Sequence, residues 1–338
     1  MCAWIVILNW NGWADTIECL ETVFRSDYPS FRVVVCDNDS QDGSLEHLKA
    51  WAEGRLEARV PGDNPLRALS FPPIRKPVPY VEYERAVAEL GGDPAASDLP
   101  LVLVQTGANL GFAGGNNVGL RYVIARGDGE YVWLLNNDTV VRPDSLRQLI
   151  LEMRRHSEVG IVGSTLLYYH APDTIQTLGG ASYNRWLALP HHIGALQSAN
   201  LPIPTHEVTA RMAYVSGASM LVSRDFLHDV GLLSEEYFLY FEELDWAVRA
   251  KGKFELAYAP ESVVYHKEGG TAGARSTEAE KSWVADYYFM RNRIVFTRKF
   301  LPAMLPTVYF ALLVALLRRA RRGRWDRVRM IAKLCWSP

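Results

Sequence analysis

The chain has 338 residues, of which 49% are hydrophobic, so it is long enough to bury the core of one large domain or two small ones. Its formal net charge of −2 gives no general basis for binding nucleic acid. The charge is unevenly placed, because residues 318–338 hold seven Arg, one Lys and one Asp (+7), which leaves −9 for the other 317 residues. A basic tail beside an apolar run favours an anionic membrane surface as partner, and a solvated basic helix is the alternative.

The cysteines and the N-terminus bear on location. Cys2, Cys19, Cys36 and Cys335 have no zinc-ligand spacing, which predicts reduced thiols in a cytosolic protein. Met1 leads almost at once into the apolar stretch 4–8, without a basic segment or a cleavage site, so we expect no secretory signal peptide.

Strand and helix patterns alternate along most of the chain. Short runs rich in β-branched residues predict buried strands, and apolar residues at helical spacing predict the helices between them. In chain order these are strand 3–8, helix 14–26, strand 31–36, helix 44–53, strand 101–105, helix 115–126, strand 131–136, helix 143–156 and strand 159–163. This order is typical of an α/β fold with a mostly parallel central sheet and flanking helices.

Two regions interrupt the alternation. Residues 54–98 carry six prolines between Pro61 and Pro79, which predicts an insertion at the edge of the sheet. Residues 165–210 are interpreted as rich in loops. Beyond them we expect a strand at 212–222, a helix at 242–251, and a strand at 254–259 that precedes Val263-Val-Tyr-His266.

Polar residues follow several predicted strands. Asn9, Asp37, Asn109 and Asp138 each come just after a strand end, and ligands of open parallel sheets bind outside the carboxyl ends of the strands. The carboxylates of Asp37 and Asp39 could accept hydrogen bonds from a nucleotide base or a ribose, although an acidic turn is the alternative. Asp138 ends an apolar strand and supplies the hard oxygen that Mg²⁺ prefers.

The glycine-rich segment 109–117 is predicted as a turn leading into a helix. Glycine allows a phosphate to approach the backbone closely, and tight packing of helix on sheet is the alternative. The segment lacks both the G-x-G-x-x-G spacing and a Gly-Lys-Ser/Thr sequence, which argues against dehydrogenases and ATPases.

Three acids, Glu242, Glu243 and Asp245, crowd one helical turn among aromatic residues. Carboxylates in apolar surroundings have raised pKa values, which suits a general base, although acids also favour helix N-termini. His266 follows a strand and precedes a glycine pair, which makes it a candidate second metal ligand.

With these motifs in place, the chain resembles glycosyltransferase family 2 enzymes of the GT-A fold, in particular their rhamnosyltransferase-like and galactofuranosyltransferase-like bacterial branch. The resemblance runs from about Trp4 to about Gly270. It rests on Asn9-Trp-Asn-Gly12, Asp37-Asn-Asp-Ser-Gln-Asp-Gly-Ser44, the glycine-rich segment 109–117, Asn136-Asn-Asp138, Glu242-Glu-Leu-Asp245 and His266.

The resemblance implies an inverting, metal-dependent enzyme that moves a sugar from a nucleotide-diphosphate donor, of the dTDP-rhamnose or UDP-hexose type, to a glycan or lipid-linked acceptor of the cell envelope. Glu243 would be the base, with Glu242 or Asp245 as alternatives, and Asp138 and His266 would hold Mg²⁺ or Mn²⁺. The residues implied in donor binding are Asn9, Asn11, Asp37, Asp39, Asn109, Gly111, Phe112, Gly115, Asn116, Asn137 and Arg249.

Rival functions are a nucleotide-sugar-binding protein without catalysis and a sugar-1-phosphate nucleotidyltransferase. The second should carry a Gly- and Lys/Arg-rich loop after its first strand, where this chain has Asn9-Trp-Asn-Gly-Trp13 without a cation. Product formation would distinguish a glycosyltransferase from the first rival, the binding protein without catalysis.

The chain is predicted to divide into a catalytic domain, 1–270, and a C-terminal helical region, 271–338. Residues 300–317 carry no charge, but Pro302 and Pro306 interrupt them and both flanks are basic. This pattern favours a helix lying in the membrane plane or re-entering it, at the cytoplasmic face of the plasma membrane. A spanning helix and a core helix are the alternatives.

Overall fold

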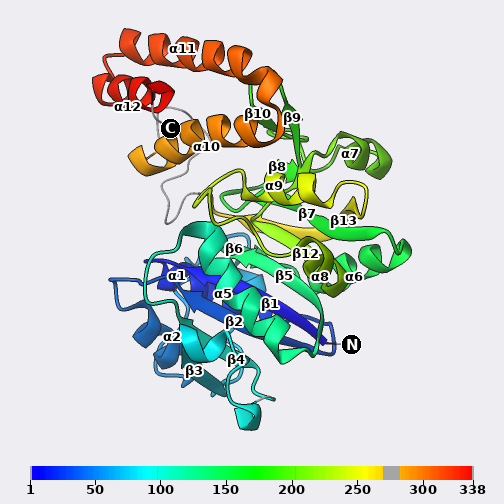
Figure 1. Ribbon diagram of the computed structural model, residues 1–338. Coiled ribbons are helices and arrows are strands. Elements are labelled where there is room, and N and C mark those ends of the chain that lie inside the picture. The colour runs from blue at the N-terminus through cyan, green and yellow to red at the C-terminus, as the bar shows by residue number, and fades with distance from the viewer. Residues whose placement is uncertain (1, 97, 202, 269–281, 337–338) are drawn as a thin grey trace.

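The computed structural model describes residues 2–96, 98–201, 203–268 and 282–336. A large central sheet is covered by helices on both faces, and the C-terminal helices form a separate layer at the top of the molecule (Figure 1). The predicted α/β class is therefore confirmed. The predicted domain boundary at 270 lies outside the described residues.

The large sheet has ten strands within the described part of the chain, in the order β3-β4-β2-β1-β5-β12-β7-β13-β6, with β8 paired to β7. Strands β3, β4, β2, β1 and β5 run parallel, and β12 lies antiparallel between β5 and β7. The strands are β1 (Cys2–Asn9), β2 (Phe31–Asp37), β3 (Tyr80–Glu84), β4 (Leu101–Gln105), β5 (Gly129–Asn136), β6 (Thr139–Val141), β7 (Val159–Tyr168), β8 (Ala171–Leu178), β12 (Ser219–Ser223) and β13 (Glu255–His266). A smaller sheet joins β10 (Leu189–His192), β9 (Gly180–Asn184) and β11 (Tyr214–Val215).

Helices form a layer on each face of the large sheet. One buried cluster joins α1, α2 and α6 to residues of β1 such as Ile5 and Ile7, and a second joins α5, α8 and α9 to Trp4 and Val6 on the opposite face. The helices are α1 (Trp13–Val23), α2 (Ser44–Ala52), α3 (Arg67–Ser70), α4 (Arg85–Ala88), α5 (Gly111–Arg126), α6 (Ser145–Arg155), α7 (Thr205–Arg211), α8 (Arg224–Val230), α9 (Glu242–Ala250), α10 (Trp283–Phe300), α11 (Leu305–Arg321) and α12 (Trp325–Trp336). Successive side chains of a strand point to opposite faces, so the buried strands pack against both helix layers.

The insertion lies at the edge of the sheet as expected, and it adds an edge strand of its own, because β3 pairs in parallel with β4. The prediction of a loop-rich region at 165–210 was wrong, since β8, β9, β10 and α7 lie there. These elements are short and half exposed, so their polar residues hide the apolar periodicity on which the prediction rests. The strand expected at 212–222 is divided into β11 and β12 by a turn at 216–218.

The C-terminal helices pack against one another and against the β9–β10 hairpin. Val308 and Leu312 of α11 are fully buried against residues of α10 and α12. Asp286 of α10 also forms buried ion pairs with Arg319 and Arg327. By length and composition, the segment Pro302–Arg321 could cross a membrane, with a mean hydropathy of 1.5 and 17% of its window buried.

Candidate active site

The carboxyl ends of β1 and β2 are tied together by hydrogen bonds. Asn9 Nδ2 donates to Asp37 Oδ1 at 2.6 Å, and the backbone N–H of Ser40 donates to Asp37 Oδ2 at 3.1 Å. Asn11 accepts from the backbone of Gln41 at 2.7 Å. The predicted residues Asn9, Asn11 and Asp37 therefore lie together, and the buried Asp37 carboxylate shapes the turn that leaves Asp39 exposed with φ of 62°.

A residue missed by the sequence reasoning joins this turn to the glycine-rich segment. Asn38, which is 2% exposed, donates from Nδ2 to Asn109 Oδ1 at 3.0 Å and accepts from Leu110 N at 3.0 Å. Asn109 Oδ1 also accepts from Gly111 N. Asn38 lies between two acids, Asp37 and Asp39, which are the more obvious candidates for polar contacts. Its place directly after the end of β2 was nevertheless a usable signal.

The glycine-rich segment forms the first turns of α5, which begins at Gly111 and not at 115 as predicted. A Cβ on Gly115 would lie 2.3 Å from Leu8 Cδ1, so this glycine lets the helix pack tightly on β1. Asn116 Nδ2 donates to the Phe112 carbonyl within the helix. Close packing of helix on sheet is thus the visible role of Gly115.

Gly111 gives a testable case, since its φ is +71° and a Cβ there would lie 2.3 Å from the Phe238 carbonyl oxygen. Gly107 is a matched control, with φ of +74° and no atom within 4 Å of its Cβ position. We expect Gly107→Ala to lower the free energy of unfolding by about 1–2 kcal/mol through backbone strain alone. Gly111→Ala should lower it by roughly a further 1–3 kcal/mol through overpacking. Urea denaturation measures both, and equal losses would contradict the close approach.

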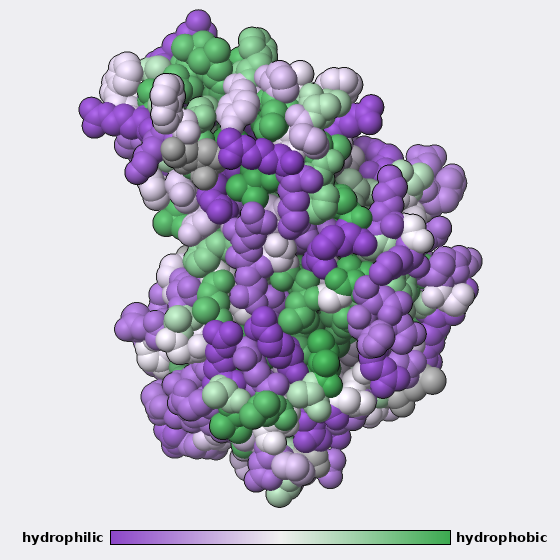
Figure 2. All heavy atoms as spheres, viewed as in Figure 1, coloured by the Kyte–Doolittle hydropathy of each residue, from purple (hydrophilic) through white to green (hydrophobic). Residues whose placement is uncertain are grey.

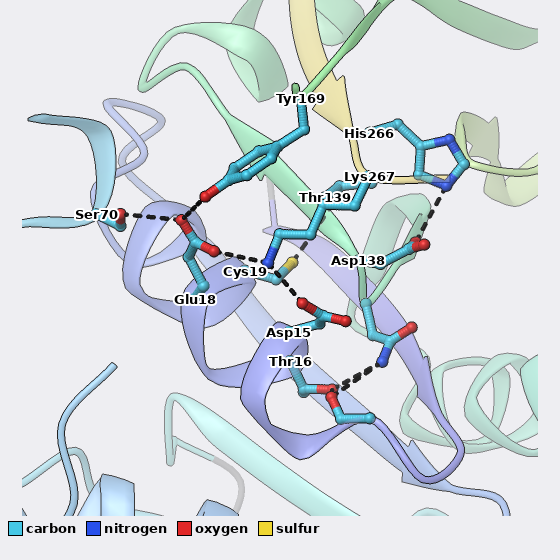
Figure 3. Close-up of polar contacts among 12 residues, drawn as sticks. Asp15, Thr16, Glu18, Cys19, Ser70, Asp138, Thr139, Tyr169, His266 and Lys267 are labelled. Carbon is cyan, nitrogen blue, oxygen red and sulfur yellow. Dashed lines mark hydrogen bonds and ion pairs between the residues drawn. The ribbon is translucent and has the colours of Figure 1, made fainter. Parts of the chain in front are cut away.

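Asp138 and His266 meet at the carboxyl ends of β5 and β13 (Figure 3). His266 Nε2 lies 3.1 Å from Asp138 Oδ1, and both residues are nearly buried. Burial alone would lower the pKa of His266, but the charge and hydrogen bond of Asp138 outweigh it and raise the pKa. Asn137 Nδ2 donates to Thr16 Oγ1 at 3.0 Å and reaches Asn9 Oδ1 at 3.4 Å, which joins this pair to the first cluster.

The Asp138–His266 pair fits a divalent cation. Gln176 Oε1 accepts from His266 Nδ1 at 2.9 Å, so a neutral imidazole turns the lone pair of Nε2 towards the Asp138 carboxylate. Two facing acceptors need a proton or a cation between them, and the Asp138 carboxylate is the kind of ligand that suits Mn²⁺ or Mg²⁺. No cluster of three or more His, Cys, Asp and Glu suited to a metal occurs in the described residues, so further ligands would come from the donor or water.

The acidic turn of α9 lies beside β12. A Cβ on Gly217 would lie 2.5 Å from Glu243 Oε1 and 3.0 Å from Phe112 Cζ, so these side chains converge on that glycine. The next residue, Ala218, accepts a hydrogen bond from Asn136 N, the strand end that precedes Asp138. Through this short path the acidic turn adjoins the carboxyl end of β5.

The three acids of this turn differ in environment. Burial raises the pKa of Glu243 to about 7. Burial, together with the charge of Glu243, raises the pKa of Glu242 well above its ordinary range, and Glu242 Oε2 has no hydrogen-bond partner among the described residues. Both carboxyl groups therefore ionise less readily than an ordinary Glu, and Glu243 titrates close to neutral pH.

Asp245 is fully buried and fully engaged. Tyr237 Oη donates to it at 3.0 Å, Arg249 Nε at 2.6 Å and Lys299 Nζ at 2.8 Å. Arg249 also donates to the carbonyls of Val230 and Leu232. The structure thus places Arg249 in the support of α9 and of the loop before it.

A second missed residue is Lys267, which follows His266 and reaches back to α1 (Figure 3). Its Nζ lies 2.6 Å from Asp15 Oδ1 and 2.7 Å from Glu18 Oε2, and its backbone N–H donates to the Asp138 carbonyl. Burial would lower the pKa of Lys267, but the charges of Glu18 and Asp15 raise it, so the ammonium stays charged. This network fixes the Asp138–His266 pair on α1.

Two models of one protein family match the chain. The family model described as Glycosyltransferase like family 2 matches residues 93–286, and the model Glycosyl transferase family 2 matches residues 4–61. The chain belongs to glycosyltransferase family 2.

Two curated relatives match parts of the chain. The low-salt glycan biosynthesis hexosyltransferase Agl10 of Haloferax volcanii is 26% identical over 44% of this chain and 45% of its own length. The uncharacterized protein y4gI of Sinorhizobium fredii is 29% identical over 47% of this chain and 18% of its own length. The matches thus span less than half of either relative.

Solved structures share the GT-A fold. A mannosyltransferase from Pyrobaculum calidifontis, in complex with GDP-Man and Mn²⁺, has a TM-score of 0.52 at 15% identity and covers 98% of this chain and 84% of its own. GalNAc-T7 with UDP, GalNAc and Mn²⁺ has a TM-score of 0.54 at 12% identity, over 86% of this chain and 47% of its own. At these identities the likeness concerns the fold alone.

Proposed function

We propose that this chain transfers a sugar, with inversion at C1, from a nucleotide-diphosphate sugar to an acceptor hydroxyl with the help of a divalent cation. The observation that carries the proposal is Glu243, a carboxyl group with a pKa of about 7 that adjoins Gly217 and the strand end before Asp138. A general base works best when its pKa lies near the working pH.

In this mechanism Glu243 accepts the proton of the acceptor hydroxyl. The oxygen forms a bond to C1 from the face opposite the diphosphate, the bond from C1 to the diphosphate oxygen breaks, and the nucleoside diphosphate leaves with that electron pair. Asp138 and His266 would hold the divalent cation, which supplies charge neutralisation for the leaving diphosphate.

The first cluster binds the nucleotide in this proposal. Asp39 is exposed and free to meet a base or ribose, while Asp37 holds the turn in shape through Asn9. We assign Arg249 to the support of Asp245 in place of donor binding, because its Nε, Nη1 and Nη2 donate within the protein.

The donor is proposed to be of the dTDP-rhamnose or UDP-hexose type, as in the rhamnosyltransferase-like and galactofuranosyltransferase-like branch. The hexosyltransferase named in Haloferax volcanii supports a hexose. The acceptor is proposed to be a glycan or lipid-linked hydroxyl of the cell envelope.

A donor screen tests the proposal. The purified chain with Mn²⁺ is offered UDP-, GDP- and dTDP-sugars, and release of free nucleoside diphosphate is followed. Metal-dependent release from one donor supports transfer. Metal-dependent binding without release would favour the binding protein, and absence of both binding and release would overturn the proposal.

We further propose that α11 lies in the plane of the cytoplasmic face of the membrane. Phe310, Leu313 and Leu317 form one exposed stripe, at 66%, 50% and 49% exposure, while the opposite face packs on α10 and α12. Hydrophobic and strongly hydrophilic residues lie side by side over the C-terminal helices in Figure 2. An apolar stripe beside Arg318 and Arg321 suits anionic lipid, and the buried opposite face argues against a spanning helix.

Vesicle binding tests this surface. We expect the chain to sediment with phosphatidylglycerol vesicles and much less with phosphatidylcholine. The double substitution Phe310→Ser and Leu313→Ser should weaken binding by about 10-fold or more, because each buried apolar side chain contributes about 1.5–3 kcal/mol. Leu90→Ser, at an 84% exposed site in the insertion, is the control and should bind like wild type. Equal binding by all three proteins would contradict the assignment.

A further inference from the structure

The loop before α9 is held in a strained conformation. Phe238, Tyr240 and Phe241 have φ values of 63°, 69° and 78°, in the left-handed region that side chains with a Cβ avoid at a cost of roughly 1–2 kcal/mol each. Phe241 is the N-cap of α9, directly before Glu242 and Glu243. Strain of this kind persists only where surrounding contacts enforce it, and it gathers at functional sites.

One side chain of the C-terminal region enforces this conformation. Asn292 of α10 is fully buried, and its Nδ2 lies 2.9, 2.8 and 2.9 Å from the carbonyl oxygens of Tyr237, Leu239 and Tyr240. Arg291 Nη1 donates to Asn292 Oδ1 at 2.8 Å and so turns the amide nitrogen towards the loop. Each of these carbonyls belongs to the residue directly before a left-handed residue, and all three accept from the same amide group.

Aromatic packing ties the same loop to α10. The Phe238 ring stacks on Tyr288, with centroids 4.6 Å apart, and Phe241 lies against Phe289 and Phe296. The face of α10 that carries Asn292 therefore packs directly against this loop.

The loop also contacts the glycine-rich segment at the start of α5. The Phe238 carbonyl oxygen accepts from Phe112 N at 2.6 Å, and Phe112 borders Gly217 together with Glu243. A shift of this loop would therefore move both the start of α5 and the start of α9.

We infer that Asn292 is the positioning residue that sets Glu243 for proton transfer, so that α10 is part of the catalytic apparatus and not only a link to the C-terminal helices. This inference rests on the proposed function, because it assigns Glu243 as the base. Asn292 touches no reacting atom in this scheme, and it acts through the 237–241 backbone. Without its donors the loop can relax towards ordinary φ values and turn the first residues of α9.

The test compares Asn292→Asp with Thr297→Val. Asn292→Asp keeps the shape but replaces the donor with an oxygen that faces three carbonyls. Thr297 is a buried residue of the same helix whose Oγ1 donates to Arg293 O at 2.6 Å, away from the loop. We expect Asn292→Asp to lower kcat about 100-fold, the cost of a displacement near 1 Å, with the donor KM within about 3-fold.

Arg291→Ala provides a milder variant that leaves Asn292 in place and should lower kcat in the same direction by a smaller factor. Hydrogen exchange of residues 237–247 gives a readout that needs no turnover. Faster exchange there in Asn292→Asp, but not in Thr297→Val, supports the positioning role even if wild type releases no nucleotide, in which case the proposed function alone fails. Unchanged exchange, or equal losses of kcat in Asn292→Asp and Thr297→Val, would overturn the inference.

Discussion

Replacing Glu243 with Gln is expected to lower kcat by about 10²–10⁴-fold, because the variant cannot take the proton of the acceptor hydroxyl. Donor binding should change little, since the amide keeps the shape of the carboxyl group. Wild-type activity should rise with pH through about 7, because Glu243 acts as a base only after it has lost its proton. This limb should be absent from the residual activity of Glu243→Gln.

Glu242→Gln is the matched comparison, one residue away in the same buried turn. In this account Glu243, which lies against Gly217, takes the proton, so Glu242→Gln should cost far less turnover than Glu243→Gln. Glu243→Gln should also fold at least as well as wild type above pH 7. The raised pKa means that ionisation of Glu243 destabilises the folded state as pH rises from the unfolded value towards 7 and beyond, and Gln has no such charge. A larger loss in Glu242→Gln than in Glu243→Gln would exchange the two roles.

Asp138→Asn is expected to weaken Mn²⁺-dependent nucleotide binding by at least about 10-fold, the size seen when even an outer partner of a metal ligand is removed. The change removes the charged oxygen that faces His266 Nε2 at 3.1 Å while keeping the size of the side chain. Titration calorimetry with UDP or the accepted nucleotide, with and without Mn²⁺, measures the loss.

Asp144→Asn is the control, because Asp144 lies between β6 and α6 and pairs with Arg142. It should keep wild-type metal dependence. Binding that depends equally on Mn²⁺ in wild type and in Asp138→Asn would remove Asp138 from the metal site.

The main frame of the fold could be predicted because buried parallel strands are continuous apolar runs. Ile5, Val33 and Leu103 lie in such runs, and the polar residues that end them marked one edge of the sheet. The β8–β10 region could not be predicted in this way. Its strands are half exposed, so polar residues interrupt the apolar pattern that marks a buried strand.

The residues of the site could be named more easily than their roles. The spacing of Glu242, Glu243 and Asp245 marked an acidic turn, but only packing shows that Asp245 is engaged by three donors while Glu243 titrates near neutral pH. Lys267 and Asn292 were out of reach, because each acts on residues distant in the chain. The Asn292 contacts span more than 50 positions, and no local pattern reports them.

The most direct test follows the products of the accepted donor by phosphorus and proton NMR, with Mn²⁺ and a simple alcohol as a surrogate acceptor. The account predicts that nucleoside diphosphate and glycoside appear in equal amounts, with the anomeric configuration opposite to that of the donor. Retention of that configuration would contradict direct displacement assisted by Glu243. Release of nucleoside monophosphate with sugar phosphate would contradict glycosyl transfer itself.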